Sequence, residues 1–99
     1  MRYVQANPST AQTNTALVAL KSGRYVSLAS VYISSDTAMT VSLVNSVTHD
    51  LVWRQYVGAT GGAAIEDGLG TSALNEGIDY STSATGNVFL KVGYKYSDD

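Results

Sequence analysis

Apolar and polar residues alternate along most of this chain, and that period of two constrains its fold more than any other feature. The C-terminal segment has the clearest pattern, with Val88, Leu90, Val92, Tyr94 and Tyr96 at every second position. Successive side chains of a β-strand point to opposite faces, so this alternation predicts a strand with one buried face. Apolar residues at helical spacing are almost missing, and we therefore expect an all-β fold.

The alternating segments recur at roughly ten-residue spacing, separated by residues that favour turns. They are residues 2–5, 13–21, 24–34, 39–43, 51–57, 63–65, 78–83 and 88–96. Within 24–34 the apolar phase changes near Ala29 and Ser30, which predicts a β-bulge or a bend where the strand passes from one sheet to another. About eight short strands at this spacing are typical of an antiparallel β-sandwich of the jelly-roll type.

A chain of 99 residues can bury one core, so we expect a single domain. We expect residues 1–10 to form a short N-terminal arm and residues 11–97 to form the sandwich. The expected core residues are Val31, Ile33, Met39, Val41, Leu43, Trp53, Leu90 and Val92. Trp53 should lie at the centre of the core, because an indole ring buries a large apolar area. Its neighbour Val52 should point to the opposite face of the strand.

Charged residues make up only 14% of the chain, well below the roughly 25% that is usual for soluble domains. Such a surface either associates with partner subunits or reflects the Ser/Thr-rich strand faces that are common in β proteins. The net charge is −2, and the six basic residues are scattered, which argues against nucleic acid as a partner. No apolar run resembles a signal peptide or a membrane span, so we expect a soluble protein made in the cytoplasm, with no membrane partner.

Few residues could carry chemistry. The chain has no cysteine, and its one histidine, His49, lies beside Asp50 in an expected turn, where solvent exposure explains it better than catalysis. Glu66, Asp67, Glu76 and Asp79 flank or lie within the glycine-rich stretch 58–77, where they are either solvated loop acids or calcium ligands. They lack the spacing of a known calcium loop, and we expect no catalytic, cofactor or metal site. Asp98 and Asp99 should form a solvated tail.

Seven of the nine aromatic residues are tyrosines. Five lie on expected strands, namely Tyr32, Tyr56, Tyr80, Tyr94 and Tyr96. Such rings are expected at the margin of the core with the hydroxyl in water. Tyrosine is also enriched in subunit interfaces, and a row of exposed rings can form a sugar-binding face. All three interpretations stay open at this point.

The segment 26–44, with its Ser-Ser-Asp-Thr-Ala turn between two alternating strands, resembles small structural proteins of tailed-bacteriophage virions. Residues 86–96 are similar to the closing strand of those proteins. The resemblance implies a non-enzymatic virion protein, a β-sandwich that decorates or cements the capsid, commonly as a homotrimer above the junctions between capsomers. It implies the major capsid protein or another virion protein as the partner, with residues 1–10 and 58–77 as the expected contacts.

Other functions remain as alternatives. Similar sandwiches occur in proteins that attach phage tails or fibres. A carbohydrate-binding module would need an exposed aromatic row beside polar groups, and a small hydrolase or metal-dependent enzyme would need a perturbed carboxylate or histidine in a cleft.

Overall fold

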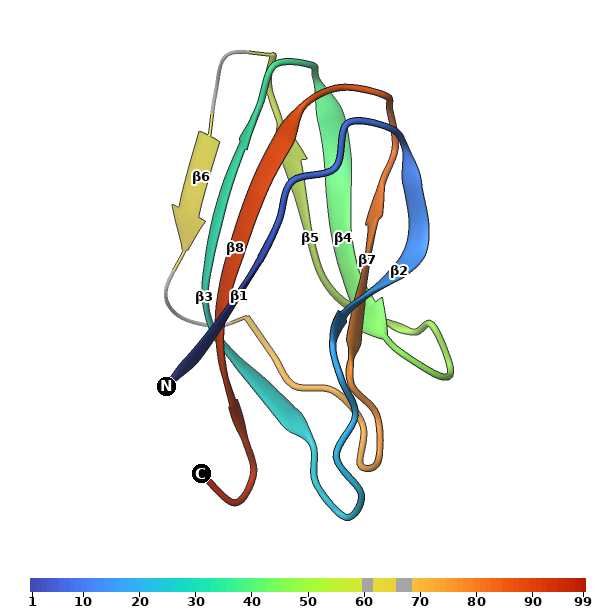
Figure 1. The fold of residues 1–99 in the computed structure, drawn as a ribbon, viewed down its shortest axis with the longest axis vertical. Helices are drawn as coiled ribbons and strands as arrows, with labels where there is room; N and C mark the ends of the chain where they lie inside the picture. Colours follow the sequence, from blue (N-terminus) through green and yellow to red (C-terminus); the bar gives the residue numbers. More distant parts are fainter. Residues whose placement is uncertain (60–61, 66–68) are drawn as a thin grey trace.

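The computed structural model describes residues 1–59, 62–65 and 69–99, and these form eight β-strands (Figure 1). In chain order the strands are β1 (Arg2–Ala6), β2 (Gln12–Val18), β3 (Val26–Ser35), β4 (Met39–Asn45), β5 (Leu51–Val57), β6 (Gly62–Ile65), β7 (Ile78–Thr82) and β8 (Val88–Tyr96). All neighbouring strands pair antiparallel, which confirms the expected all-β class. No helix suited to crossing a membrane occurs in this described part of the chain.

The strands pair like one long hairpin that has been rolled up. β1 pairs with β8, β2 with β7, β3 with β6 and β4 with β5. Pairing of β3 with β8 and of β4 with β7 then closes two sheets of four, in the orders β1-β8-β3-β6 and β2-β7-β4-β5. Figure 1 shows the two sheets facing each other along the long axis of the molecule. This is the jelly-roll sandwich that the sequence predicted.

The core lies between the sheets and is built from the inward phase of each strand. On β4, Met39, Val41 and Leu43 are buried while the alternating Thr40 and Ser42 are partly exposed. On β3 and β8 the expected core residues Val31, Ile33, Leu90 and Val92 are likewise buried. These residues belong to one hydrophobic cluster with members from both sheets. Their predicted place in the core is therefore confirmed.

Trp53 is the exception among the expected core residues. It lies on β5, the outermost strand of its sheet, and packs against the core while staying partly exposed. Its cross-strand partner Leu43, on the inner strand β4, is fully buried instead. The register shifts between Leu43 and Val44, and Val52 also packs against the core. The central position of Trp53 and the opposite orientation of Val52 were therefore wrong.

The expected bulge in β3 is present. The register of β3 against β8 shifts between Leu28 and Ser30, where the apolar phase changes in the sequence. Both halves of β3 pair with β8, so the strand does not cross to the other sheet. The phase change thus marks a bulge, and the alternative of a sheet change was wrong.

The first ten residues contribute a strand to the sandwich. β1 pairs with β8 over five residues, from Arg2 opposite Tyr94 to Ala6 opposite Leu90. The Pro8 carbonyl then accepts a hydrogen bond from the Val88 N–H at the start of β8, at 3.0 Å. The segment expected as an arm is therefore the outer strand of one sheet, and any contact it makes with a partner stays a prediction.

Candidate functional site

His49 and Asp50 lie in the exposed turn between β4 and β5, as expected. The backbone of His49 has a positive φ of 63°, and its N–H donates to the carbonyl of Asn45, at 3.0 Å. His49 thus serves the turn through its backbone. Among the described residues, no serine hydroxyl forms a hydrogen bond with the imidazole.

Glu76 closes the same turn from a distant part of the chain. The side chain is buried, and its Oε1 accepts hydrogen bonds from the N–H groups of Val47 (2.9 Å) and Thr48 (2.8 Å) and from the Thr48 hydroxyl (3.2 Å). The Thr48 N–H bond is the main reason that the pKa of Glu76 is lowered. Glu76 is therefore a turn-organising residue, and its expected place among solvated loop acids was wrong.

Asp79 is also buried, on the outer side of β7 between Ala16 of β2 and Val44 of β4. Burial raises the pKa of Asp79, and the nearby charge of His49 opposes that rise. The other two acids considered as calcium ligands, Glu66 and Asp67, lie outside the described residues. Among the residues that are described, no group of three or more His, Asp or Glu side chains could hold a metal ion.

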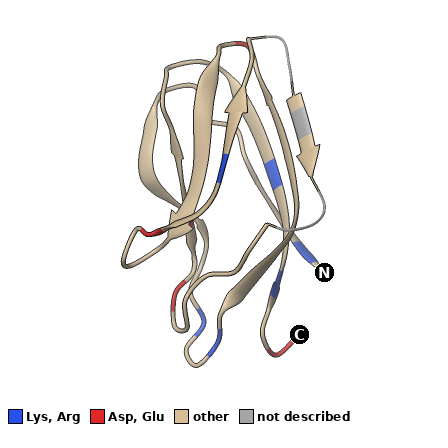
Figure 2. Ribbon diagram, turned by 180° about the vertical axis from the view of Figure 1, so that it is seen from behind, with Lys and Arg blue, Asp and Glu red and all other residues tan. Residues whose placement is uncertain are grey.

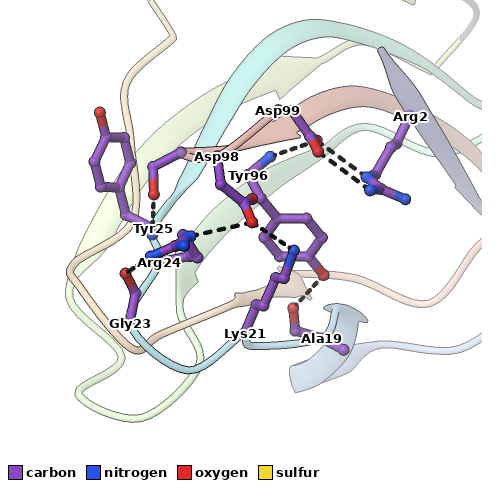
Figure 3. Close-up of polar contacts among 10 residues, drawn as sticks. Arg2, Ala19, Lys21, Gly23, Arg24, Tyr25, Tyr96, Asp98 and Asp99 are labelled. Carbon is purple, nitrogen blue, oxygen red and sulfur yellow. Dashed lines mark hydrogen bonds and ion pairs between the residues drawn. The ribbon is translucent and has the colours of Figure 1, made fainter.

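The C-terminal acids hold three chain segments together (Figure 3). Asp99 accepts a hydrogen bond from the guanidinium of Arg2 on β1, with Arg2 Nε 3.0 Å from Asp99 Oδ2. Asp98 pairs with Lys21 (2.8 Å) and Arg24 (3.1 Å) of the β2–β3 connection. The hydrogen bond from Arg2 is the main cause that lowers the pKa of Asp99 to about 2. Both acids are exposed, as expected for a solvated tail, and they also form ion pairs, which add little stability each at this exposure.

Tyr96 is the centre of this contact. Its hydroxyl donates to the carbonyl of Ala19, at 2.7 Å, and its ring lies 5.4 Å from the guanidinium of Arg2 and from the ammonium of Lys21 (Figure 3). The ring also meets that of Tyr94 edge to face, with centroids 5.7 Å apart. These contacts fix the chain ends and give no sign of a reaction centre.

The strand tyrosines divide into two groups. Tyr80 is buried, and Tyr94 and Tyr96 pack partly against the core, as expected for rings at its margin. Tyr32 and Tyr56 lie on the outer faces of the two sheets, and the exposed fraction of Tyr56 is 65%. Of these five rings, the two on the outer faces are placed to meet a partner.

The outer face of the β2-β7-β4-β5 sheet is covered by hydroxyl groups. A shallow hollow of about 430 Å³ there is lined by Gln12, Thr13, Thr40, Ser42, Arg54, Ser81, Thr82 and Ser83. Many of these groups bond within the sheet, for example Arg54 Nε to Ser42 Oγ at 3.2 Å. Tyr56 is not a lining residue, but it is the cross-strand partner of Thr40, which is one. This face therefore has one exposed ring together with hydrogen-bonding groups, which is part of what a sugar-binding face needs.

The outer face of the β1-β8-β3-β6 sheet has a different chemistry. It carries aromatic rings and lysines, namely Tyr3 on β1, Tyr32 on β3, and Phe89, Lys91 and Lys95 on β8. Tyr3 is 57% exposed and Phe89 is 37% exposed. Figure 2 shows the acidic residues near the ends of the sandwich, away from the middle of this sheet. The alternation within residues 88–96 assigned Phe89, Lys91 and Lys95 to an outward face, but only the pairing of β1 with β8 adds Tyr3.

Strand β5 leaves an edge open for pairing. The backbone of Thr40 forms hydrogen bonds on the β7 side. Its N–H donates to Ser83 Oγ (2.8 Å), and its carbonyl accepts from the Ser83 N–H (3.0 Å). Tyr56 lies opposite Thr40, so in an antiparallel ladder the N–H and carbonyl of Tyr56 point away from β4, and the carbonyl accepts a local hydrogen bond from Gln55 Nε2, at 3.1 Å. Two register shifts interrupt the other edge of this sheet, β2, whereas β5 has one, at Val52, and is regular over residues 53–57.

Comparisons with family models, with curated proteins and with solved structures found no match to this chain. The fold and the surfaces described above therefore carry the functional argument by themselves. A jelly roll is shared by viral capsid domains, lectin domains and enzymes, so fold alone does not select among them.

Proposed function

We propose that the protein is a non-enzymatic structural subunit of a phage virion, most simply a capsid decoration or cement protein. The observation that carries the proposal is the outer face of the β1-β8-β3-β6 sheet, where tyrosine and phenylalanine rings are exposed although the core is complete without them. Exposed aromatic patches on a folded domain mark interaction surfaces. The weakly charged composition and the resemblance of residues 26–44 point the same way.

The perturbed titratable groups support a role without chemistry. The lowered pKa values of Glu76, Asp98 and Asp99 arise from bonds that close a turn or fasten the chain ends. Asp36 belongs to the same group, since Asn87 bonds to it through both its backbone N–H and its side-chain amide, each at 2.8 Å, and so lowers its pKa. Catalytic residues need a reactive group held toward a substrate, and these carboxylates are engaged by the protein's own turns.

The subunit assembles as a homo-oligomer in this proposal, with a trimer as the expected form. The open edge of β5 supports self-association, because an unpaired strand edge can add a strand from a neighbour. Tyr56→Lys places a charge on that edge and should reduce the oligomer to a monomer in multi-angle light scattering. Val47→Lys is the matched control, since Val47 is 62% exposed in the neighbouring turn. Equal masses for both variants would contradict a role for the edge.

Attachment to the virion is tested by co-sedimentation with empty capsids of the phage that, in this proposal, encodes the chain. The protein should pellet with the shells and raise their resistance to heat. Recovery with purified tails or fibres instead would support the alternative of a tail or fibre attachment protein. Failure to pellet with any of these particles would contradict a virion role.

A carbohydrate-binding module is the second candidate, favoured by the hydroxyl-lined hollow beside Tyr56. Hydroxyl groups and a ring face are what sugars use for hydrogen bonding and stacking. A glycan array would test it, with Tyr56→Ala as the variant that removes the ring. Binding that survives this variant would exclude the hollow as the sugar site.

A further inference from the structure

A small hollow opens on the outer face of the β1-β8-β3-β6 sheet. Its volume is about 230 Å³, and it is lined by Met1, Tyr3, Ala29, Ser30 and Tyr32. Gly93 lies beneath it, paired with Tyr3 on one side and with Ser30 on the other. A Cβ atom on Gly93 would overlap Ser30 Oγ and come within 3.1 Å of Tyr3 Cε1. Glycine at position 93 therefore makes room for the side chains around the hollow.

Ser30 gives the hollow an unsatisfied polar group. The residue is only 5% exposed, and its Oγ has no hydrogen-bond partner within the part of the chain that the structure describes. The bulge between Leu28 and Ser30 puts this hydroxyl at the lining. Buried polar groups in folded proteins are nearly always bonded, so a polar atom entering the hollow would complete what Ser30 lacks.

The charge around the hollow is positive. Lys91 Nζ lies 5.0 Å from the centroid of the Tyr3 ring, and Lys91 is the cross-strand neighbour of Tyr32. Lys95 lies further along the outward phase of the same strand. Among the described residues the ion pairs use Arg2, Lys21 and Arg24, and neither Lys91 nor Lys95 takes part in one. Cations that pair with no acid in the described part of the face attract an anionic partner.

We propose that this face docks an acidic protein surface and that the hollow at Ser30 receives a carboxylate side chain of the partner. The carboxylate accepts hydrogen bonds from the Ser30 hydroxyl and from the Lys91 ammonium, while the methylene groups of the same side chain pack between Tyr3 and Tyr32. The exposed rings of Tyr3 and Phe89 favour a protein over a small anion, because only a large partner covers them. The identity of the partner as a virion protein rests on the proposed function, whereas the chemistry of the site does not.

The test uses the full chain, labelled with ¹⁵N, and a blocked hexapeptide of alternating glutamate and alanine as the probe. In low salt the peptide should cause saturable shifts of backbone amides near positions 3, 30–32 and 91–93. Lys91→Ala should weaken binding about tenfold, which corresponds to about 1.4 kcal/mol. Lys21→Ala is the matched control, because it removes an equal charge that is already ion-paired with Asp98, and it should leave the affinity within about twofold. Added salt should weaken binding.

Ser30→Ala separates a binding role from a structural one. Because the Ser30 hydroxyl has no hydrogen-bond partner among the described residues, its removal should weaken peptide binding without lowering the unfolding midpoint. A hydroxyl that only supported the fold would lower the midpoint instead. The variants' amide spectra report in the same experiment whether each remains folded.

Three results would overturn the proposal: no saturable shift at millimolar peptide, equal shifts with a lysine–alanine peptide, or equal affinities for the Lys91→Ala and Lys21→Ala variants. Capsid binding tests the proposed function and peptide binding tests the docking face, so the two proposals can fail separately. Peptide binding without capsid binding would contradict only the virion role. Capsid binding that survives Lys91→Ala would contradict only the docking face.

Discussion

Gly77 occupies the tightest backbone crossing in the described sandwich, and replacing it tests the packing directly. It lies just before β7, where the chain passes between the end of β2 and the residue after β4. An added Cβ would overlap the carbonyl oxygen of Val18 and lie 2.7 Å from the amide nitrogen of Leu20. Both obstacles are backbone atoms, so no side-chain rotation can relieve the overlap.

The cost of Gly77→Ala follows from two contributions. Forcing an extra carbon into a packed interior costs about 1–3 kcal/mol and sometimes more. The shift also strains two bonds, since Gly77 N–H donates to Ser46 Oγ (2.8 Å) and its carbonyl accepts from Ser46 N–H (3.1 Å). Each such bond is worth about 1 kcal/mol. We therefore expect a loss of about 3–5 kcal/mol, a large part of the roughly 5–15 kcal/mol that stabilises a domain.

Urea unfolding followed by the fluorescence of the single tryptophan, Trp53, measures this loss. With a dependence of about 1–3 kcal/mol per molar urea, the midpoint should fall by at least about 1 M. Gly58→Ala is the control, because a Cβ at Gly58 would meet no atom within 4 Å. Gly77→Ala with the same midpoint as Gly58→Ala would refute the close approach of β2 to Gly77.

Three further predictions use the same unfolding assay or a pH titration. Leu43→Ala should lower the free energy of unfolding by about 2–5 kcal/mol, because Leu43 is fully buried. Leu51→Ala, at a position 52% exposed, should change it by no more than about 0.5 kcal/mol. Similar losses for the two variants would contradict the assigned burial. Asp79→Asn should raise the unfolding midpoint at pH 7, because the raised pKa of Asp79 means that folding disfavours its charged form. This gain in stability should vanish below pH 3.8. A lower midpoint for the variant at pH 7 would contradict the prediction. Asp99 should titrate near pH 2 by carboxyl NMR, so its stabilising contact is present above pH 3.8 and lost as the pH falls through about 2. Arg2→Ala should raise this pKa toward its ordinary value, and an unchanged pKa would exclude the pair.

The strands could be predicted from the sequence because their signal is local. Alternation and turn residues mark where a strand begins and ends, and the bounds of 51–57 and 88–96 agree with β5 and β8. The bulge near Ala29 was visible for the same reason, as a change of phase along one strand. Such signals need no knowledge of which strand lies beside which.

The order of strands in the sheets is what periodicity cannot supply. Trp53 has the pattern of a core residue, and only the position of β5 at an edge leaves it partly exposed. Glu76 resembles a loop acid in the sequence, yet it is buried because it caps a turn 28 residues earlier. In both cases the deciding neighbour is distant in the chain, and burial follows from pairing that no local pattern encodes.

The candidate docking face combines both kinds of signal. The phase change that places Ser30 at the hollow could be read from the sequence, and so could the outward phase of Lys91. The ring of Tyr3 reaches Lys91 only because the first strand pairs with the last, which is a property of the rolled hairpin as a whole. Since β1 forms one wall of the hollow, removal of residues 1–6 should abolish peptide binding together with the pairing along β8, whereas an arm outside the fold could be removed without loss of either.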